Sequence, residues 1–279
     1  MKLAVSNIAW NPVESRAAYG LLRSKGITGL EVAPGLLFPE TDDPFDPSES
    51  EVREAVAAIT DAGLELVSMQ SLLYGVDGAA MFTTAEARRT LSHGLSRAIT
   101  LAGRLGVPNL VFGSPKQRRF PPRMSAKEAE NQALDLFLEL GELAAAAATI
   151  ITVEANPAIY GTNFLNTTQQ AADFVRRVDH PSIRLVLDLG AVHMNDDFDR
   201  IEALIADVSS VLHHVHVSEP NLDPAPADTA QAERVLGALA IVGYEGFTSI
   251  EMRRDDGGLV TVEAAVSRLA DAAMSVNRS

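Results

Sequence analysis

The chain carries histidines and acids in positions that suit metal chemistry. Three of its six histidines fall inside the stretch LHHVHVSE of residues 212–219. Glu154, Asp188 and Glu251 each end a short, mostly apolar run. Because the chain has no cysteine, any metal must be held by nitrogen and oxygen ligands. An oxygen-rich set with one imidazole favours Mn²⁺ as the first expectation, with Mg²⁺, Co²⁺ or Fe²⁺ as alternatives and Zn²⁺ still open.

The elements that would position these residues recur along the chain as short aliphatic runs, each followed by a segment of helical periodicity. Eight such runs are expected to be strands: 3–6, 29–32, 64–70, 109–112, 150–154, 185–188, 212–217 and 247–251. Their alternation with seven or eight helices predicts an α/β fold, a (β/α)₈ TIM barrel forming a single domain over residues 1–279. A doubly wound open sheet is the alternative, but no GxGxxG turn follows the first run.

Strand parity separates the three clustered histidines, because side chains alternate between the barrel interior and the helix layer. Val215 and Val217 belong against helices, so His214 and His216 should point inward and His213 outward. His216 is nearer the C-terminal mouth, where TIM barrels carry their active sites. His214, which lies deeper, is expected to be buried and hydrogen-bonded instead of a ligand.

Glu154, Asp188 and Glu251 should meet His216 at this mouth, since each lies at the end of a strand. Two unit charges about 4 Å apart repel by about 4 kcal/mol at an effective dielectric near 20, so three clustered acids require a compensating charge. A divalent cation supplies it. An isolated acid after a strand is more simply a helix cap or an ion-pair partner, but three on consecutive units predict a metal site.

Other side chains that follow the predicted strands are candidates for substrate contact. Trp10 could form an apolar wall against a bound substrate or seal the barrel, and Gln70 could equally contact the substrate or cap a turn. The stretch KQRR at 116–119 reads either as a solvated loop or as a pocket for one anionic group. The full set of substrate-binding candidates is Trp10, Gln70, Lys116, Asn156, His193 and Glu219.

Composition restricts the partners of the chain. The formal net charge of −14 argues against nucleic acid, which needs a basic surface. The longest apolar run, near residues 143–153, is too short to span a membrane. The N-terminal residues lack the pattern of a signal peptide, so we expect a cytoplasmic protein. A homo-oligomer remains open.

The sequence resembles the sugar phosphate isomerase/epimerase superfamily, the xylose isomerase-like TIM barrels (AP endonuclease family 2) that include ketose 3-epimerases and endonuclease IV. The resemblance implies metal ligands at the ends of strands five to eight. It also implies an isomerase that moves a proton through a metal-stabilised enediolate, with Glu154 and Glu251 as paired catalytic residues. The stretches that carry the resemblance are GLEVAP (29–34), VFGSPKQR (111–118), VEANPAIYGTNFLNT (153–167), LVLDLGAVH (185–193), HVHVSEPNL (214–222) and SIEMRR (249–254).

At three positions, ketose 3-epimerases carry residues that bind substrate hydroxyls, and this chain carries other residues there. Tyr160 replaces a glutamate, Ala191 a histidine and Leu222 an arginine. The resemblance therefore leaves open which sugar or cyclitol is bound and whether it is phosphorylated. A dehydratase of inosose or dehydroshikimate type is the main alternative function. An endonuclease IV-like phosphodiesterase is disfavoured by the negative charge and the few histidines, and a non-catalytic sugar-binding barrel by the intact ligand set.

Overall fold

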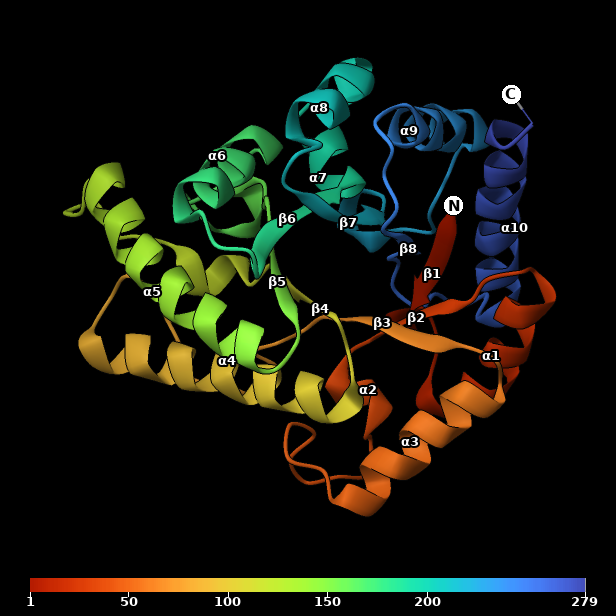
Figure 1. Cartoon of the computed structure of the whole chain (residues 1–279), viewed down its shortest axis with the longest axis horizontal. Coiled ribbons are helices and arrows are strands. Elements are labelled where there is room, and N and C mark those ends of the chain that lie inside the picture. Colours follow the sequence, from red (N-terminus) through yellow and green to blue (C-terminus); the bar gives the residue numbers. More distant parts are fainter. Residues whose placement is uncertain (279) are drawn as a thin grey trace.

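A computed structural model describes residues 1–278 of the chain. Eight parallel strands pair in chain order and close into a barrel (Figure 1), with β8 hydrogen-bonded to β1. The α/β barrel predicted from the sequence is confirmed, and the open-sheet alternative is wrong. The strands are β1 (Lys2–Ser6), β2 (Gly29–Val32), β3 (Glu65–Met69), β4 (Asn109–Phe112), β5 (Ile150–Glu154), β6 (Ile183–Asp188), β7 (Leu212–Val217) and β8 (Phe247–Ile250).

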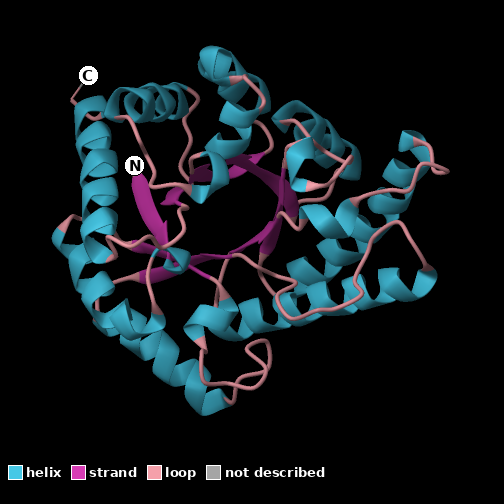
Figure 2. Cartoon of the chain, turned by 180° about the vertical axis from the view of Figure 1, so that it is seen from behind, coloured by secondary structure: helices cyan, strands magenta, loops and turns pink. Residues whose placement is uncertain are grey.

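Helices surround the strands as an outer layer, which the view in Figure 2 shows around the central ring of strands. Each predicted strand is present, and its ends differ from the expected ones by at most two residues. None of the helices in residues 1–278 has the length and hydropathy needed to cross a bilayer. The α-helices are α1 (Ser15–Ser24), α2 (Pro34–Leu37), α3 (Glu49–Asp61), α4 (Ala85–Leu105), α5 (Ala126–Ala146), α6 (Thr168–Val178), α7 (Leu189–Met194), α8 (Ile201–Val208), α9 (Thr229–Ile241) and α10 (Leu259–Val276).

Local sequence fixes where several of these helices begin. Ser125 accepts a hydrogen bond from the Glu128 amide at 3.2 Å, and the Glu128 carboxylate accepts one from the Ser125 amide at 2.8 Å. This reciprocal capping box satisfies two amides that have no partner inside the helix. Capping boxes also begin α3 and α6. The helix starts are therefore encoded locally, and tertiary packing decides how the helices lie against the barrel.

The barrel interior is unusually polar. Val153, Leu187 and Ile250 point outward into the helix layer and are fully buried there. The opposite faces of the strands carry polar and charged side chains into the barrel, as strand parity predicts. His214 and His216 reach Glu31 of β2 inside the barrel, and His213 is only half-buried. The buried polar residues of the strands are Ser6, Glu31, Ser68, Asn109, Thr152, His214, His216, Thr248 and Ser249.

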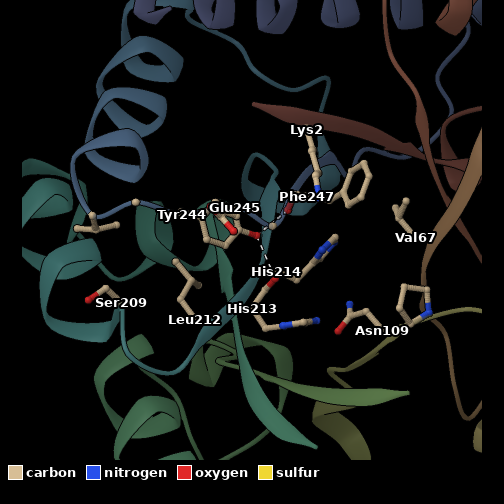
Figure 3. A pocket seen from close by; sticks show the side chains of 14 residues that line it. Lys2, Val67, Asn109, Ser209, Leu212, His213, His214, Tyr244, Glu245 and Phe247 are labelled. Atoms are coloured by element: carbon tan, nitrogen blue, oxygen red, sulfur yellow. Dashed lines mark hydrogen bonds between the residues drawn. The ribbon is translucent and has the colours of Figure 1, made fainter. Parts of the chain in front are cut away.

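The two ends of the barrel each hold a cavity. One of about 460 Å³ lies at the N-terminal end, where Lys2, Asn109 and Phe247 begin their strands (Figure 3). The other, of about 440 Å³, lies at the C-terminal end and is bordered by Glu154, Asp188 and Glu251. Only the second cavity coincides with the acids that the sequence singles out. Its position matches the end at which TIM barrels carry their active sites.

Candidate active site

Four side chains from consecutive strands meet at the C-terminal mouth. Glu154 and Asp188 end β5 and β6, and Glu251 directly follows β8. The Nδ1 atom of His216, on β7, lies 3.2 Å from Glu251 Oε2, 3.6 Å from Glu154 Oε1 and 3.8 Å from Asp188 Oδ2. The structure thus brings together all four residues expected to bind metal, with ligand atoms close enough to surround one ion.

The cluster is electrostatically strained when no cation is bound. Burial, together with the charges of Glu154 and Glu251, raises the pKa of Asp188 to about 7. Burial also raises the pKa of Glu251. Burial alone would lower the pKa of His216, but the Glu31 and Glu251 carboxylates outweigh it and raise that pKa well above its ordinary value.

Hydrogen bonds hold the carboxylates in place. The Asn156 side-chain amide donates to Glu154 Oε2 at 2.6 Å, which leaves Oε1 facing His216. Ser218 Oγ donates to Asp188 Oδ2 at 2.6 Å, and the Ala191 amide donates to Asp188 Oδ1 at 2.6 Å. These contacts fix the orientation of both acids before any ligand arrives, which lowers the entropic cost of binding.

The donor set fits a divalent cation. His216 Nδ1 is buried and has no hydrogen-bond partner among the described residues, although three carboxylates face it. A nitrogen in this position is satisfied by coordination, and the three oxygens around it are hard ligands of the kind that Mn²⁺ and Mg²⁺ accept. The neighbouring cavity of about 440 Å³ has the size of a small-molecule site.

Sequence reasoning missed one charged residue of this region, Glu31 of β2. Its side chain is fully buried, and its Oε2 lies 3.0 Å from His214 Nε2 and 3.1 Å from His216 Nε2. Burial by itself would raise the pKa of Glu31, but the two imidazoles lower it below the ordinary value. The available signal was an acid between Leu30 and Val32, at the inward-facing position of an otherwise apolar strand.

Two of the six expected substrate contacts border the cavity. Asn156 lines it beside Glu154, and Glu219 lines it while accepting a hydrogen bond from the Ala227 amide at 2.9 Å. Tyr160 and Arg253, which the sequence did not nominate for substrate contact, also line it.

The other four expected contacts lie elsewhere. Trp10 is buried against Tyr19. Gln70 directly follows β3, and its Nε2 donates to Oγ of Ser6, the last residue of β1, at 2.8 Å. Lys116 is exposed on the short helix η3 (Pro115–Arg118), of which Pro115 but not Lys116 lines the cavity. The ring of His193 stacks on Phe198 with centroids 4.2 Å apart. These four residues do not line the cavity of about 440 Å³ beside Glu154, Asp188 and Glu251.

The fold agrees with the comparisons to known proteins. The family model of the xylose isomerase-like TIM barrel matches residues 20–274. The chain belongs to the xylose isomerase-like TIM-barrel family. The solved structure of 3-keto-D-glucoside 4-epimerase from E. coli, a barrel of the same fold, superimposes with a TM-score of 0.75 at 18% identity, covering 100% of both chains.

Two curated relatives of this xylose isomerase-like barrel are epimerases. D-psicose 3-epimerase of Ruminiclostridium cellulolyticum is 34% identical over 96 residues, which are 34% of this chain and 32% of that protein. Ketose 3-epimerase of Arthrobacter globiformis is 24% identical over 210 residues, 72% of this chain and 68% of that protein. The first alignment therefore spans about a third of the relative's own length.

Gly113, which follows β4, provides a test of the cavity wall. A Cβ atom at this position would lie 2.5 Å from Glu154 Oε2, so Gly113→Ala is expected to push the carboxylate away from Asn156 and His216. If Glu154 binds a divalent cation as expected, displacing its carboxylate should weaken Mn²⁺ binding by about 10-fold or more, the range seen when the orientation of a ligand is lost. Titration calorimetry on chelator-treated protein measures this affinity.

Gly237→Ala in α9 is the matched control, because no described atom lies within 4 Å of a Cβ added there. It should leave Mn²⁺ affinity unchanged and raise helix stability by about 0.5–1 kcal/mol. Equal metal affinities of the two variants would contradict the position of Glu154 in the site.

Proposed function

We propose that this chain is a divalent-metal-dependent epimerase or isomerase of a sugar or sugar-like polyol, with the barrel of residues 1–279 acting as one catalytic domain. The observation that carries the proposal is the meeting of Glu154 and Glu251 around His216 Nδ1. The named epimerases among the relatives support the substrate class, since each acts on a carbohydrate by its name.

The proposed metal ligands are Glu154, Asp188, His216 and Glu251. Among them they offer one nitrogen and three carboxylates with atoms close together, and the nitrogen has no other partner among residues 1–278. When bound there, a divalent cation supplies Lewis-acid stabilisation of negative charge on neighbouring substrate oxygens. Mn²⁺ is the proposed ion, on the basis of the oxygen-rich donor set.

Glu154 and Glu251 are proposed to act as a pair of proton carriers. They come from β5 and β8, three strands apart around the closed barrel, and therefore enter the cavity from different sides. One carboxylate removes the proton from a carbon next to the carbonyl, and the other returns a proton to the opposite face. Burial raises the pKa of Glu251, which favours its holding a proton that it can return to the substrate.

Other residues of the cavity are proposed to orient the substrate. Asn156 keeps Glu154 Oε1 directed at the site through its 2.6 Å bond to Oε2. Tyr160 and Leu222 narrow the cavity, and Arg253, which pairs with Asp223 at 3.3 Å, presents a positive charge at its rim. Arg253 is thus the proposed contact for substrate oxygens, in place of Lys116, which does not line the cavity.

Metal analysis of the purified protein, followed by a substrate panel in D₂O, tests the function. We expect one divalent ion per chain, and deuterium entering a substrate C–H bond when a ketose, aldose or cyclitol is supplied with Mn²⁺ or Co²⁺. Release of water from a cyclitol or a dehydroshikimate-like acid, without epimerisation of any sugar, would instead assign the lyase alternative. Absence of both metal and exchange would contradict the proposal.

A further inference from the structure

Glu31 is a buried charge for which the reaction described above has no use. It lies in β2, outside the four metal-binding positions, and its side chain is completely enclosed by the barrel. Its Oε2 atom accepts from two rings of β7, at 3.0 Å from His214 Nε2 and 3.1 Å from His216 Nε2. Burying a carboxylate this deeply costs free energy unless its partners compensate the negative charge. The contacts of Glu31 with two histidines therefore point to a functional role.

The two nitrogens of His216 face different groups. Nε2 points at Glu31, and Nδ1 points at the carboxylates of the mouth, the nearest being Glu251 at 3.2 Å. A neutral imidazole carries one N–H, and the hydrogen bond made by one nitrogen decides which nitrogen is left with a lone pair. Because an ionised carboxylate can only accept, Glu31 requires the proton on Nε2.

We propose that Glu31 is the positioning residue of the metal site, holding His216 as the Nε2–H tautomer so that the Nδ1 lone pair faces the cation. The inference rests on the proposed metal site and adds a residue from the opposite side of the barrel. Carboxylates that accept from the remote N–H of a metal-bound histidine fix the orientation of the ring and strengthen its donor nitrogen.

His214 completes the arrangement by holding Glu31. Its ring stands nearly perpendicular to that of His216, at 83° with centroids 5.1 Å apart, and both rings converge on the same oxygen of Glu31. Its other side borders the N-terminal cavity, where Figure 3 shows the ring beside Lys2 and Phe247. The order from the N-terminal cavity to the mouth is therefore His214, Glu31, His216 and then the three carboxylates that would hold a cation.

A second cation among Glu31, His214 and His216 is the rival interpretation, because their ligand atoms also lie close together. The two contacts have ordinary hydrogen-bond lengths, and Glu31 directs one oxygen at both rings while its Oε1 has no partner among the described residues. Two rings donating to one oxygen explain this geometry without an ion. Metal stoichiometry distinguishes the two interpretations.

Glu31→Gln is the main test, because it keeps the size of the side chain and removes its charge. In chelator-treated protein, we expect Mn²⁺ affinity by calorimetry to fall about 10–100-fold, the usual loss when the partner of a ligating histidine is removed. Glu65→Gln, the same change at the exposed start of β3, is the matched control and should bind Mn²⁺ as the wild type does. Unchanged affinity in Glu31→Gln would overturn the inference.

Nitrogen NMR of the unaltered protein gives a second readout that does not depend on the variant folding. In the Mg²⁺-saturated wild type, His216 should show a protonated Nε2 and an unprotonated Nδ1. Protonation on Nδ1 would overturn the inference, as would two bound ions per chain falling to one in Glu31→Gln. A wild type that binds no divalent cation refutes the proposed function itself, so the two failures are distinguishable.

Discussion

Glu251→Gln is expected to lower turnover on the best substrate of the panel by about 10²–10⁴-fold, the usual contribution of a positioned acid or base. The amide keeps the shape of the side chain and an oxygen that can face His216, so most of the loss should appear in kcat at saturating Mn²⁺. Steady-state kinetics, with metal content measured in the same sample, separates this effect from loss of the ion.

The pairing of two glutamates makes a sharper prediction for isotope exchange. With Glu251 removed, Glu154 can still take a proton from one face of the substrate, so deuterium should enter from D₂O into one epimer and no longer into the other. Glu154→Gln should show the opposite preference. Glu245→Gln, at an exposed position beside the N-terminal cavity, is the control and should exchange normally. Full epimerisation by Glu251→Gln would contradict the paired mechanism.

His216→Ala is expected to have the largest effect on both metal binding and folding. It removes the single nitrogen of the ligand set and leaves Glu31 with one of its two hydrogen bonds. Mn²⁺ affinity should fall by more than the about 100-fold upper limit expected for a partner of a ligand. The metal-free protein should lose about 3–5 kcal/mol of unfolding free energy, because a buried charge loses its partner.

Calorimetry and urea denaturation of chelator-treated protein measure these two quantities. His213→Ala is the matched control, since His213 lies on the same strand but borders the N-terminal cavity and makes no contact with Glu31. It should bind Mn²⁺ as the wild type does. Wild-type metal content in His216→Ala would show that the assigned site is wrong.

Much of this site follows from strand periodicity. A strand directs alternate side chains to opposite faces, and the carboxyl ends of the barrel strands all meet at one mouth. Glu154, Asp188 and Glu251 stand at the ends of recognisable strands, so their meeting could be predicted without coordinates. The same parity separates His216 from His213 within LHHVHVSE.

Residues on loops could not be placed in this way. His193 follows Asp188 by five positions, but α7 carries its ring onto Phe198, away from the cavity. Lys116 follows β4, yet η3 turns it toward solvent. A residue that follows a strand can be assigned to the C-terminal end of the barrel from sequence alone. The direction of its side chain depends on loop conformation, which has no period that sequence alone could reveal.

The sequence by itself determined the alternation of strands and helices and the capping boxes at helix starts, because these depend on contacts within a few residues. It also determined which four side chains face the mouth, because strand parity sets their direction. The tertiary structure alone decided the contact between Glu31 and the two histidines, which are 183 and 185 positions away in the chain. Barrel closure brings β2 within reach of β7 across the interior. Inside the closed barrel, Glu31 of the otherwise apolar β2 contacts His214 and His216.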